Sequence, residues 1–208
     1  MSPAYLRLYK HVLESIFTHL NLSELARVSA TCRDWSGAVY SMRPIGACAG
    51  KGKHLQSMRN SRLVRHVSYI CIIETPIGVS GLTSLCDIIK QSNSLLGLTL
   101  CATSIGDAGA VAIAEAIAQS KSLLWVNLWR DTIGDQGAIA IAEAIKQSTL
   151  LTKVDLYRNY IGDKGACSIA KAIKQSKAKV VVVLHGNYTT SDKGVVAIEE
   201  AIKQRENK

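Results

Sequence analysis

The segment Ala112-Ile113-Ala114-Glu115-Ala116-Ile117 returns unchanged as Ala140-Ile141-Ala142-Glu143-Ala144-Ile145, 28 positions further along the chain. A second motif keeps the same interval and occurs three times, as Ile105-Gly106-Asp107, Ile133-Gly134-Asp135 and Ile161-Gly162-Asp163. A fixed period of this length is the sequence signature of a repeat protein, whose units stack along one axis. The second half of the chain is therefore expected to be a stack of similar units.

Five units of about 28 residues fill residues 67–208, and the first and last are degenerate copies. Each begins with apolar residues at the strand period of two, followed by a turn and then by Ala and Ile at helical spacing. We expect each Ile-Gly-Asp aspartate to act as the N-cap of the helix that it precedes. Because one unit is too small to bury its own apolar face, the units must stack into a solenoid.

These units resemble leucine-rich repeats of the ribonuclease-inhibitor-like class. The clearest copy carries the L-x-x-L-x-L-x-x-N stem as Leu151, Val154, Leu156 and Asn159. Thr103 and Asp131 occupy the Asn position in other copies. The resemblance implies an α/β fold, a short right-handed solenoid with parallel strands on a concave face and helices outside.

Alternation along the strands identifies the side chains that face away from the core. Trp, Tyr and Arg, which dominate the energetics of protein interfaces, are prominent among them. We therefore predict a target-binding face formed by Tyr69, Trp125, Asn127, Trp129, Arg130, Lys153, Asp155, Tyr157 and Arg158. Its mixed charge favours a protein partner over a phosphate groove. The alternative is that the two tryptophans pack on the N-terminal helices or on a neighbouring chain.

Residues 1–45 lie outside the repeat and carry two apolar stripes at helical spacing. They resemble an F-box, because Ile16-Phe17 and Leu20 fit the first half of that pattern and Cys32-Arg33 and Trp35 fit the second. An F-box binds an adaptor of the Skp type. The resemblance assigns this contact to Leu8, Val12, Leu13, Ile16, Phe17, Leu20, Leu25, Val28 and Trp35.

An F-box joined to leucine-rich repeats implies the substrate-recognition subunit of an SCF-type cullin–RING ubiquitin ligase, which is not itself catalytic. Tyr9 and His11 stand where the family has a proline and an acid. This departure leaves an alternative open, in which residues 1–45 only cap a non-catalytic interaction scaffold. A eukaryotic origin would make the protein an endogenous receptor, and a bacterial origin would make it an effector in the host cytosol.

Residues 46–66 form a basic connector between the two parts, within a stretch from Trp35 to Ile73 that contains no acidic residue. The whole chain of 208 residues has a formal net charge of +9. Such a segment can bind nucleic acid, but no aromatic residues interleave with the cations for base stacking. We therefore expect a solvated connector, with a nucleic-acid partner as the weaker interpretation.

Catalytic and metal-binding patterns are missing from the sequence. The five histidines form no metal-spaced cluster with the six cysteines, and no Ser–His–Asp or Cys–His set is apparent. We expect no cofactor, no metal and no enzymatic activity. No apolar run reaches the roughly 18 residues of a membrane span. Cysteines without a paired framework indicate reduced thiols, and so a cytoplasmic location with the nucleus as an alternative.

Overall fold

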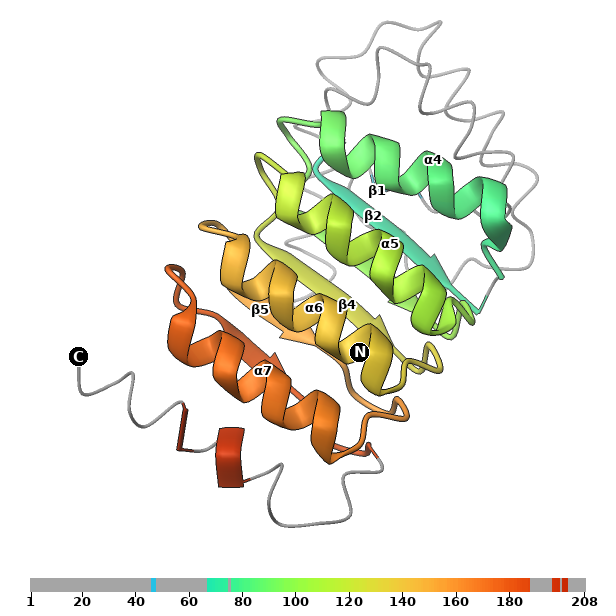
Figure 1. The fold of residues 1–208 in the computed structure, drawn as a ribbon. Coiled ribbons are helices and arrows are strands. Elements are labelled where there is room, and N and C mark those ends of the chain that lie inside the picture. Colours follow the sequence, from blue (N-terminus) through green and yellow to red (C-terminus); the bar gives the residue numbers. More distant parts are fainter. Residues whose placement is uncertain (1–45, 48–66, 75, 188–195, 199, 202–208) are drawn as a thin grey trace, which may run out of the picture.

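The computed structural model describes residues 46–47, 67–74, 76–187, 196–198 and 200–201, in which strands and helices alternate (Figure 1). The strands are β1 (Gly46–Ala47), β2 (Tyr69–Ile73), β3 (Gly97–Cys101), β4 (Trp125–Trp129), β5 (Lys153–Asp155) and β6 (Val181–Val183). The long helices are α4 (Gly78–Gln91), α5 (Gly106–Gln119), α6 (Asp135–Gln147) and α7 (Asp163–Gln175). The strand–helix alternation predicted from the repeat is confirmed.

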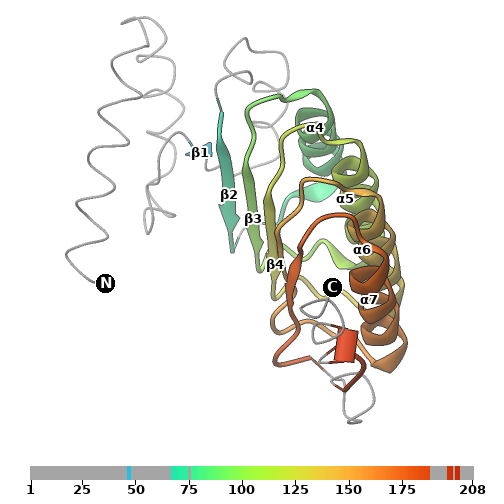
Figure 2. The same ribbon diagram turned by 90° about the vertical axis from the view of Figure 1, so that its left-hand side faces the viewer.

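The strands form one parallel sheet whose order follows the chain, β1-β2-β3-β4-β5-β6. From β2 onward, each residue pairs with the residue 28 positions later, as Gly97 does with Trp125 and Trp125 with Lys153. Helices α4 to α7 form a layer on one side of this sheet (Figure 2). The predicted solenoid is therefore present, and β1 extends its sheet into the segment that the sequence assigned to a connector.

Short aliphatic side chains fill the space between the sheet and the helices. Leu98 on β3 and Ile113 on α5 are both fully buried and belong to one continuous apolar cluster. Small residues bring the helices together. A Cβ atom built on Gly137 of α6 would lie 2.8 Å from Cβ of Ala110 on α5, closer than such atoms approach. Glycine at this position therefore permits the close packing of neighbouring repeats.

Two of the three Ile-Gly-Asp aspartates, Asp107 and Asp135, cap the helix of the following repeat and not their own. Oδ1 of Asp107 accepts hydrogen bonds from the backbone N–H groups of Gly134 (2.7 Å) and Gly137 (2.8 Å), at the start of α6. Asp135 makes the equivalent pair of bonds at the start of α7, both 2.8 Å long, to Gly162 and Gly165. The predicted own-helix cap is wrong, because each aspartate already lies in the first turn of its own helix, past the N-cap position.

A second set of polar contacts joins the repeats at the turn after each strand. Oδ1 of Asn159 accepts hydrogen bonds from the N–H groups of Asp131 (2.9 Å) and Ile133 (3.1 Å) in the preceding repeat. Its Nδ2 atom donates to the carbonyl oxygens of Leu128 (2.7 Å) and Leu156 (3.1 Å). One buried amide therefore satisfies four backbone groups on two repeats, which would otherwise be costly to bury.

Asp131 lies 28 residues before Asn159, at the equivalent position of the preceding repeat, and satisfies fewer backbone groups than Asn159 does. Its Oδ1 atom accepts bonds from the backbone N–H and the hydroxyl of Thr103, at 2.6 and 2.8 Å. Its Oδ2 atom is buried without a hydrogen-bond partner among the described residues, where Asn159 has its donating amide nitrogen. Burial raises the pKa of Asp131, and the hydrogen bonds from Thr103 and Ser104 oppose that rise. A proton on this carboxyl is thus favoured by the fold.

Replacing Asp135 by alanine should destabilise the solenoid by about 1–2 kcal/mol, the range measured for lost helix caps. The helix whose first turn is destabilised shows whether Asp135 caps the next helix or its own. Amide hydrogen exchange should accelerate at Gly162 and Gly165 in the next repeat, whereas Gly134 and Gly137 keep the cap supplied by Asp107. Substitution of the exposed neighbour Gln136 by alanine is the control. Faster exchange at Gly137 with no change at Gly165 would contradict the inter-repeat cap.

Replacing Asp131 by asparagine should stabilise the protein at neutral pH by about 1–3 kcal/mol, the cost of an unsatisfied buried polar group. The pKa of Asp131 in the folded protein lies above its unfolded value of about 3.9, so the folded state binds more protons between these two values. The stability of the wild-type protein therefore falls as the pH rises from the unfolded pKa through the folded pKa. The gain from Asp131→Asn should therefore shrink as the pH is lowered toward 4. Urea unfolding across this range, with Asp155→Asn as the matched control, measures it. A gain that does not depend on pH would contradict the assignment.

Candidate protein-binding face

Strand β4 shows how the sheet face that points away from the helices, which the resemblance predicts to be concave, is built. Val126 and Leu128 point into the core, and the alternating Trp125, Asn127 and Trp129 are half-buried on the opposite side of the sheet. This alternation is the ordinary consequence of strand geometry. Side chains at equivalent positions of neighbouring repeats then lie in rows across the sheet, because each strand pairs with the equivalent residues of the next repeat.

The first aromatic pair forms across a glycine. Tyr69 on β2 and Trp125 on β4 are two strands apart, yet their ring centroids are only 5.9 Å apart. Gly97 on β3 lies between them in the register. A Cβ atom on Gly97 would lie 2.2 Å from Cε2 of Trp125, so the indole crosses β3 directly over this glycine. The aromatic contact depends on the absence of a side chain at that position.

The second aromatic pair lies at the carboxyl ends of the strands. The rings of Trp129 and Tyr157 are 5.9 Å apart, and the guanidinium of Arg158 lies 5.2 Å from the centre of the Tyr157 ring. Gly186 follows in the next repeat, and a Cβ atom there would lie 2.9 Å from Cγ of Arg158 and 3.2 Å from Cε2 of Tyr157. Nε1 of Trp129 is buried without a hydrogen-bond partner among the described residues.

Polar side chains occupy the row between the two aromatic pairs. Oδ1 of Asn127 accepts a hydrogen bond from the N–H of Trp129 (3.1 Å), and Oδ1 of Asp155 accepts one from the N–H of Tyr157 (3.0 Å). These contacts fix the strand ends that carry the aromatic rings. Exposed cations flank the rows on both sides, Lys153 next to Trp125 and two arginines beyond the second pair.

Seven of the nine predicted target-binding residues form two clusters and not one patch, and the other two, Asn127 and Asp155, lie in the row between them. Tyr69, Trp125 and Lys153 gather near the amino ends of the strands. The other cluster, at the carboxyl ends, contains Trp129, Arg130, Tyr157 and Arg158. The role of Gly186 was missed in the sequence, although its position one repeat after Arg158 was a visible signal. The adaptor-binding residues predicted between 8 and 35 lie outside the described residues.

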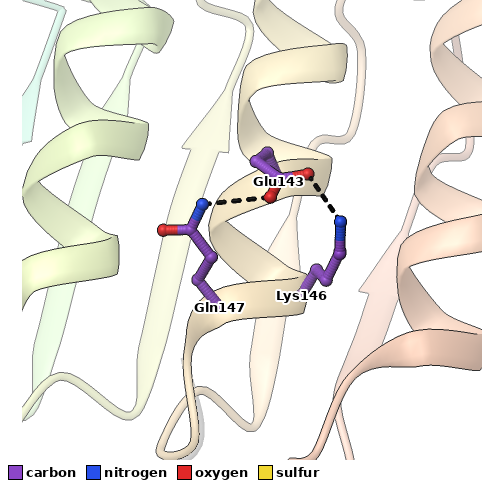
Figure 3. A network of polar contacts seen from close by, with 3 residues as sticks. All are labelled: Glu143, Lys146 and Gln147. Carbon is purple, nitrogen blue, oxygen red and sulfur yellow. Dashed lines mark hydrogen bonds and ion pairs between the residues drawn. The ribbon is translucent and has the colours of Figure 1, made fainter.

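The helical side of the solenoid offers little chemistry. Glu143, Lys146 and Gln147 form an exposed network on α6, in which Oε2 of Glu143 lies 3.3 Å from Nζ of Lys146 (Figure 3). A groove of about 520 Å³ separates α4 from α5, and Cys86 lines it. Burial raises the pKa of Cys86 to about 11, so its thiol stays protonated at neutral pH and is not a nucleophile.

No group of three or more His, Cys, Asp or Glu side chains in the described part of the chain is placed to hold a metal ion. None of the helices in the described ranges combines the length and the apolar character needed to cross a bilayer.

Comparison with known proteins identifies one domain and the fold of the rest. Residues 10–42 match the F-box-like family, which confirms an F-box-like domain where the sequence predicted one. No curated protein matches the chain in sequence. Actin-binding site 2 of leiomodin-1 superposes with a TM-score of 0.62 at 20% identity, covering 74% of this chain and 91% of that one. The tropomodulin C-terminal domain of Caenorhabditis elegans gives 0.61 at 16% identity, covering 74% and 93%.

These likenesses show a leucine-rich-repeat type of solenoid, and they do not assign the ribonuclease-inhibitor-like class, which stays a prediction. The chain therefore combines an F-box-like domain with a parallel solenoid whose concave face carries two aromatic clusters.

Replacing Gly97 by alanine should displace the indole of Trp125, because the new methyl group would occupy the position of the ring. We expect a loss of about 1–3 kcal/mol in stability, typical of overpacking, and a changed near-ultraviolet circular dichroism signal from the aromatic pair. In a Trp125→Leu background the same glycine substitution should cost much less. Equal costs in the two backgrounds, measured by urea unfolding, would show that the indole does not lie over Gly97.

Proposed function

We propose that the chain is the substrate-recognition subunit of an SCF-type cullin–RING ubiquitin ligase. Its F-box-like domain at residues 10–42 binds a Skp-type adaptor, which bridges to the ligase. Its concave face holds a protein target, which the recruited ligase modifies. The chain contributes binding alone, and the ligase supplies the chemistry. The match of residues 10–42 to the F-box-like family is the observation that carries this proposal.

The concave face supports the second half of the proposal. Half-buried aromatic rings combined with exposed cations are the composition of an interface hot spot, in which a few Trp, Tyr and Arg side chains supply most of the affinity. The rings are held by neighbouring strands of a rigid sheet, so a partner binds without first ordering them. In a eukaryotic cell such a receptor works in the cytoplasm or nucleus, and a bacterial chain of this kind would work in the host cytosol.

Calorimetric titration of the full chain with a purified Skp-type adaptor tests the proposal. We expect a dissociation constant of about 1 µM or tighter, equivalent to about −8 kcal/mol. The double variant Leu13→Asp/Phe17→Asp should lose at least tenfold in affinity, because it places two charges in the predicted apolar interface. Trp125→Ala, on the concave face, should leave adaptor affinity unchanged. A folded wild-type chain that does not bind the adaptor would refute the ligase function.

A second candidate is a non-catalytic interaction scaffold, in which residues 1–45 only cap the solenoid. One observation favours the scaffold. A solenoid of similar fold occurs in leiomodin-1, in a segment whose name, actin-binding site 2, describes it as a protein-binding site. Co-sedimentation with filamentous actin, run beside the adaptor titration, separates the two candidates. Actin binding without adaptor binding would favour the scaffold.

A further inference from the structure

Helix α4 is joined to its neighbour differently from the later helices. In the later repeats, Asp107 on α5 caps α6 and Asp135 on α6 caps α7. The residue of α4 at the equivalent position, 28 residues before Asp107, is Val79. Its side chain has no hydrogen-bonding group, and the residue is 84% exposed. The start of α5 therefore receives no cap from this position.

The backbone at the start of α5 bonds elsewhere as a result. The N–H of Gly106 donates to the carbonyl oxygen of Asp131 in the following repeat, at 2.9 Å. The N–H of Gly109 donates to the carbonyl oxygen of Ile105 in its own repeat, at 3.1 Å. The two equivalent N–H groups at the start of α6 both donate to the preceding repeat. Neither of the two groups on α5 therefore ties that helix to α4.

The packing of α4 on α5 is also looser than that of α5 on α6. A Cβ atom built on Gly137 of α6 would lie 2.8 Å from Cβ of Ala110 on α5. One repeat earlier, the same two positions hold Gly109 and Leu82. The three atoms nearest to a Cβ atom on Gly109 all belong to Ile105 of its own repeat. Because leucine needs more room than alanine, it keeps α4 away from the start of α5.

The groove of about 520 Å³ between α4 and α5 lies at this junction. Its apolar lining includes Val79, Leu82 and Cys86 from α4, and Ile105 and Ala112 from the following repeat. Sγ of Cys86 donates to the carbonyl oxygen of Ala112 across the groove, at 3.4 Å. A thiol is a weak hydrogen-bond donor, so this bond adds little to the apolar contacts between the two helices.

The strand that precedes α4 is firmly joined to its neighbour. All five residues of β2, Tyr69–Ile73, pair with β3, Gly97–Cys101. The N–H of Leu96 extends this ladder at one end and the N–H of Glu74 at the other, each through a bond of 2.8 Å. The first repeat is thus held strongly on the sheet side and weakly on the helical side, which is the arrangement of a hinge.

We infer that α4 is a hinged helix, which opens away from α5 about the paired strands β2 and β3 while α5, α6 and α7 stay packed together. Opening breaks the bond between Cys86 and Ala112 and exposes the apolar lining of the groove. Such a local opening is distinct from unfolding, because the sheet and the later caps stay in place. It gives the helical side an apolar surface that a partner can select in the open state. The inference is independent of the proposed ligase function.

Thiol labelling of the full chain with N-ethylmaleimide, without denaturant, tests the hinge. Cys86 is 7% exposed, so the reagent reaches it when α4 opens, and peptide mass spectrometry follows it separately from the other cysteines. The reference is Ala114→Cys, which places a thiol at the equivalent position of α5, where the residue is 4% exposed. We expect Cys86 to react about tenfold faster than the thiol introduced at position 114. Any destabilisation by the added thiol would speed its own labelling, and so work against the expected difference.

A pair of double variants assigns the opening to the missing cap. Val79→Asp/Leu82→Ala restores at both positions the residues that the next two repeats carry. Ser80→Asp/Leu82→Ala is the matched control, because it adds the same charge to the first turn of α4 at the next exposed position. Labelling of Cys86 should be about fivefold slower in the first variant than in the second, the effect of a typical helix cap on an equilibrium. The amides of Gly106 and Gly109 should exchange more slowly in the first variant alone.

Amide hydrogen exchange of the wild-type chain gives a measurement that needs no substitution. The amides of α4 should exchange faster than those of α6, whereas the amides of Glu74 and Leu96, which bond β2 to β3, should stay protected. Three results would overturn the inference. They are labelling of Cys86 no faster than at position 114, equal labelling of Cys86 in the two double variants, and exchange of α4 together with Glu74 and Leu96, which would mean that the first repeat unfolds as a whole.

Discussion

The structure depends on the contact between each repeat and the next, because buried polar groups of one repeat are satisfied only by its neighbour. The carboxylate of Asp107 binds two backbone N–H groups at the start of α6, and Asp135 does the same for α7. The amide of Asn159 joins the backbones of two repeats in the turn that leads from each strand to the next helix, close to these caps. A single repeat would leave these groups without partners, so the stack folds as one unit.

The regular register that follows from these contacts also organises the concave face. A side chain at one position finds its counterparts one repeat before and one repeat after it, on the neighbouring strands. Large rings fit into such rows only where a neighbour is small. Trp125 lies over Gly97, and Tyr157 lies next to Gly186. Gly97 therefore allows the rings of Tyr69 and Trp125 to meet across β3.

The two parts of the chain have separable roles. The F-box-like segment at residues 10–42 is the part with an identifiable family, and it supplies the proposed connection to a ligase. The solenoid supplies a rigid surface, because its candidate binding side chains stand on strands tied together by backbone hydrogen bonds. Rigid presentation suits a receptor, since little freedom is lost on binding.

The sequence by itself determined the period, the alternation of strand and helix, the apolar core and the residues of the concave face. All of these follow from patterns within one repeat, where a period of two or of 3.6 residues decides which side is buried. The F-box-like segment was also recognisable, from the spacing of Phe17 and Trp35.

Only the tertiary structure decided which partner each polar or aromatic side chain takes. The aspartate caps belong to the next helix, Asp131 keeps one oxygen without a partner, and β1 joins the sheet from the segment assigned to a connector. Each of these facts depends on the distance and orientation between stacked repeats. That geometry arises from the packing of one repeat on the next, so the residue pattern within a single repeat does not predict it.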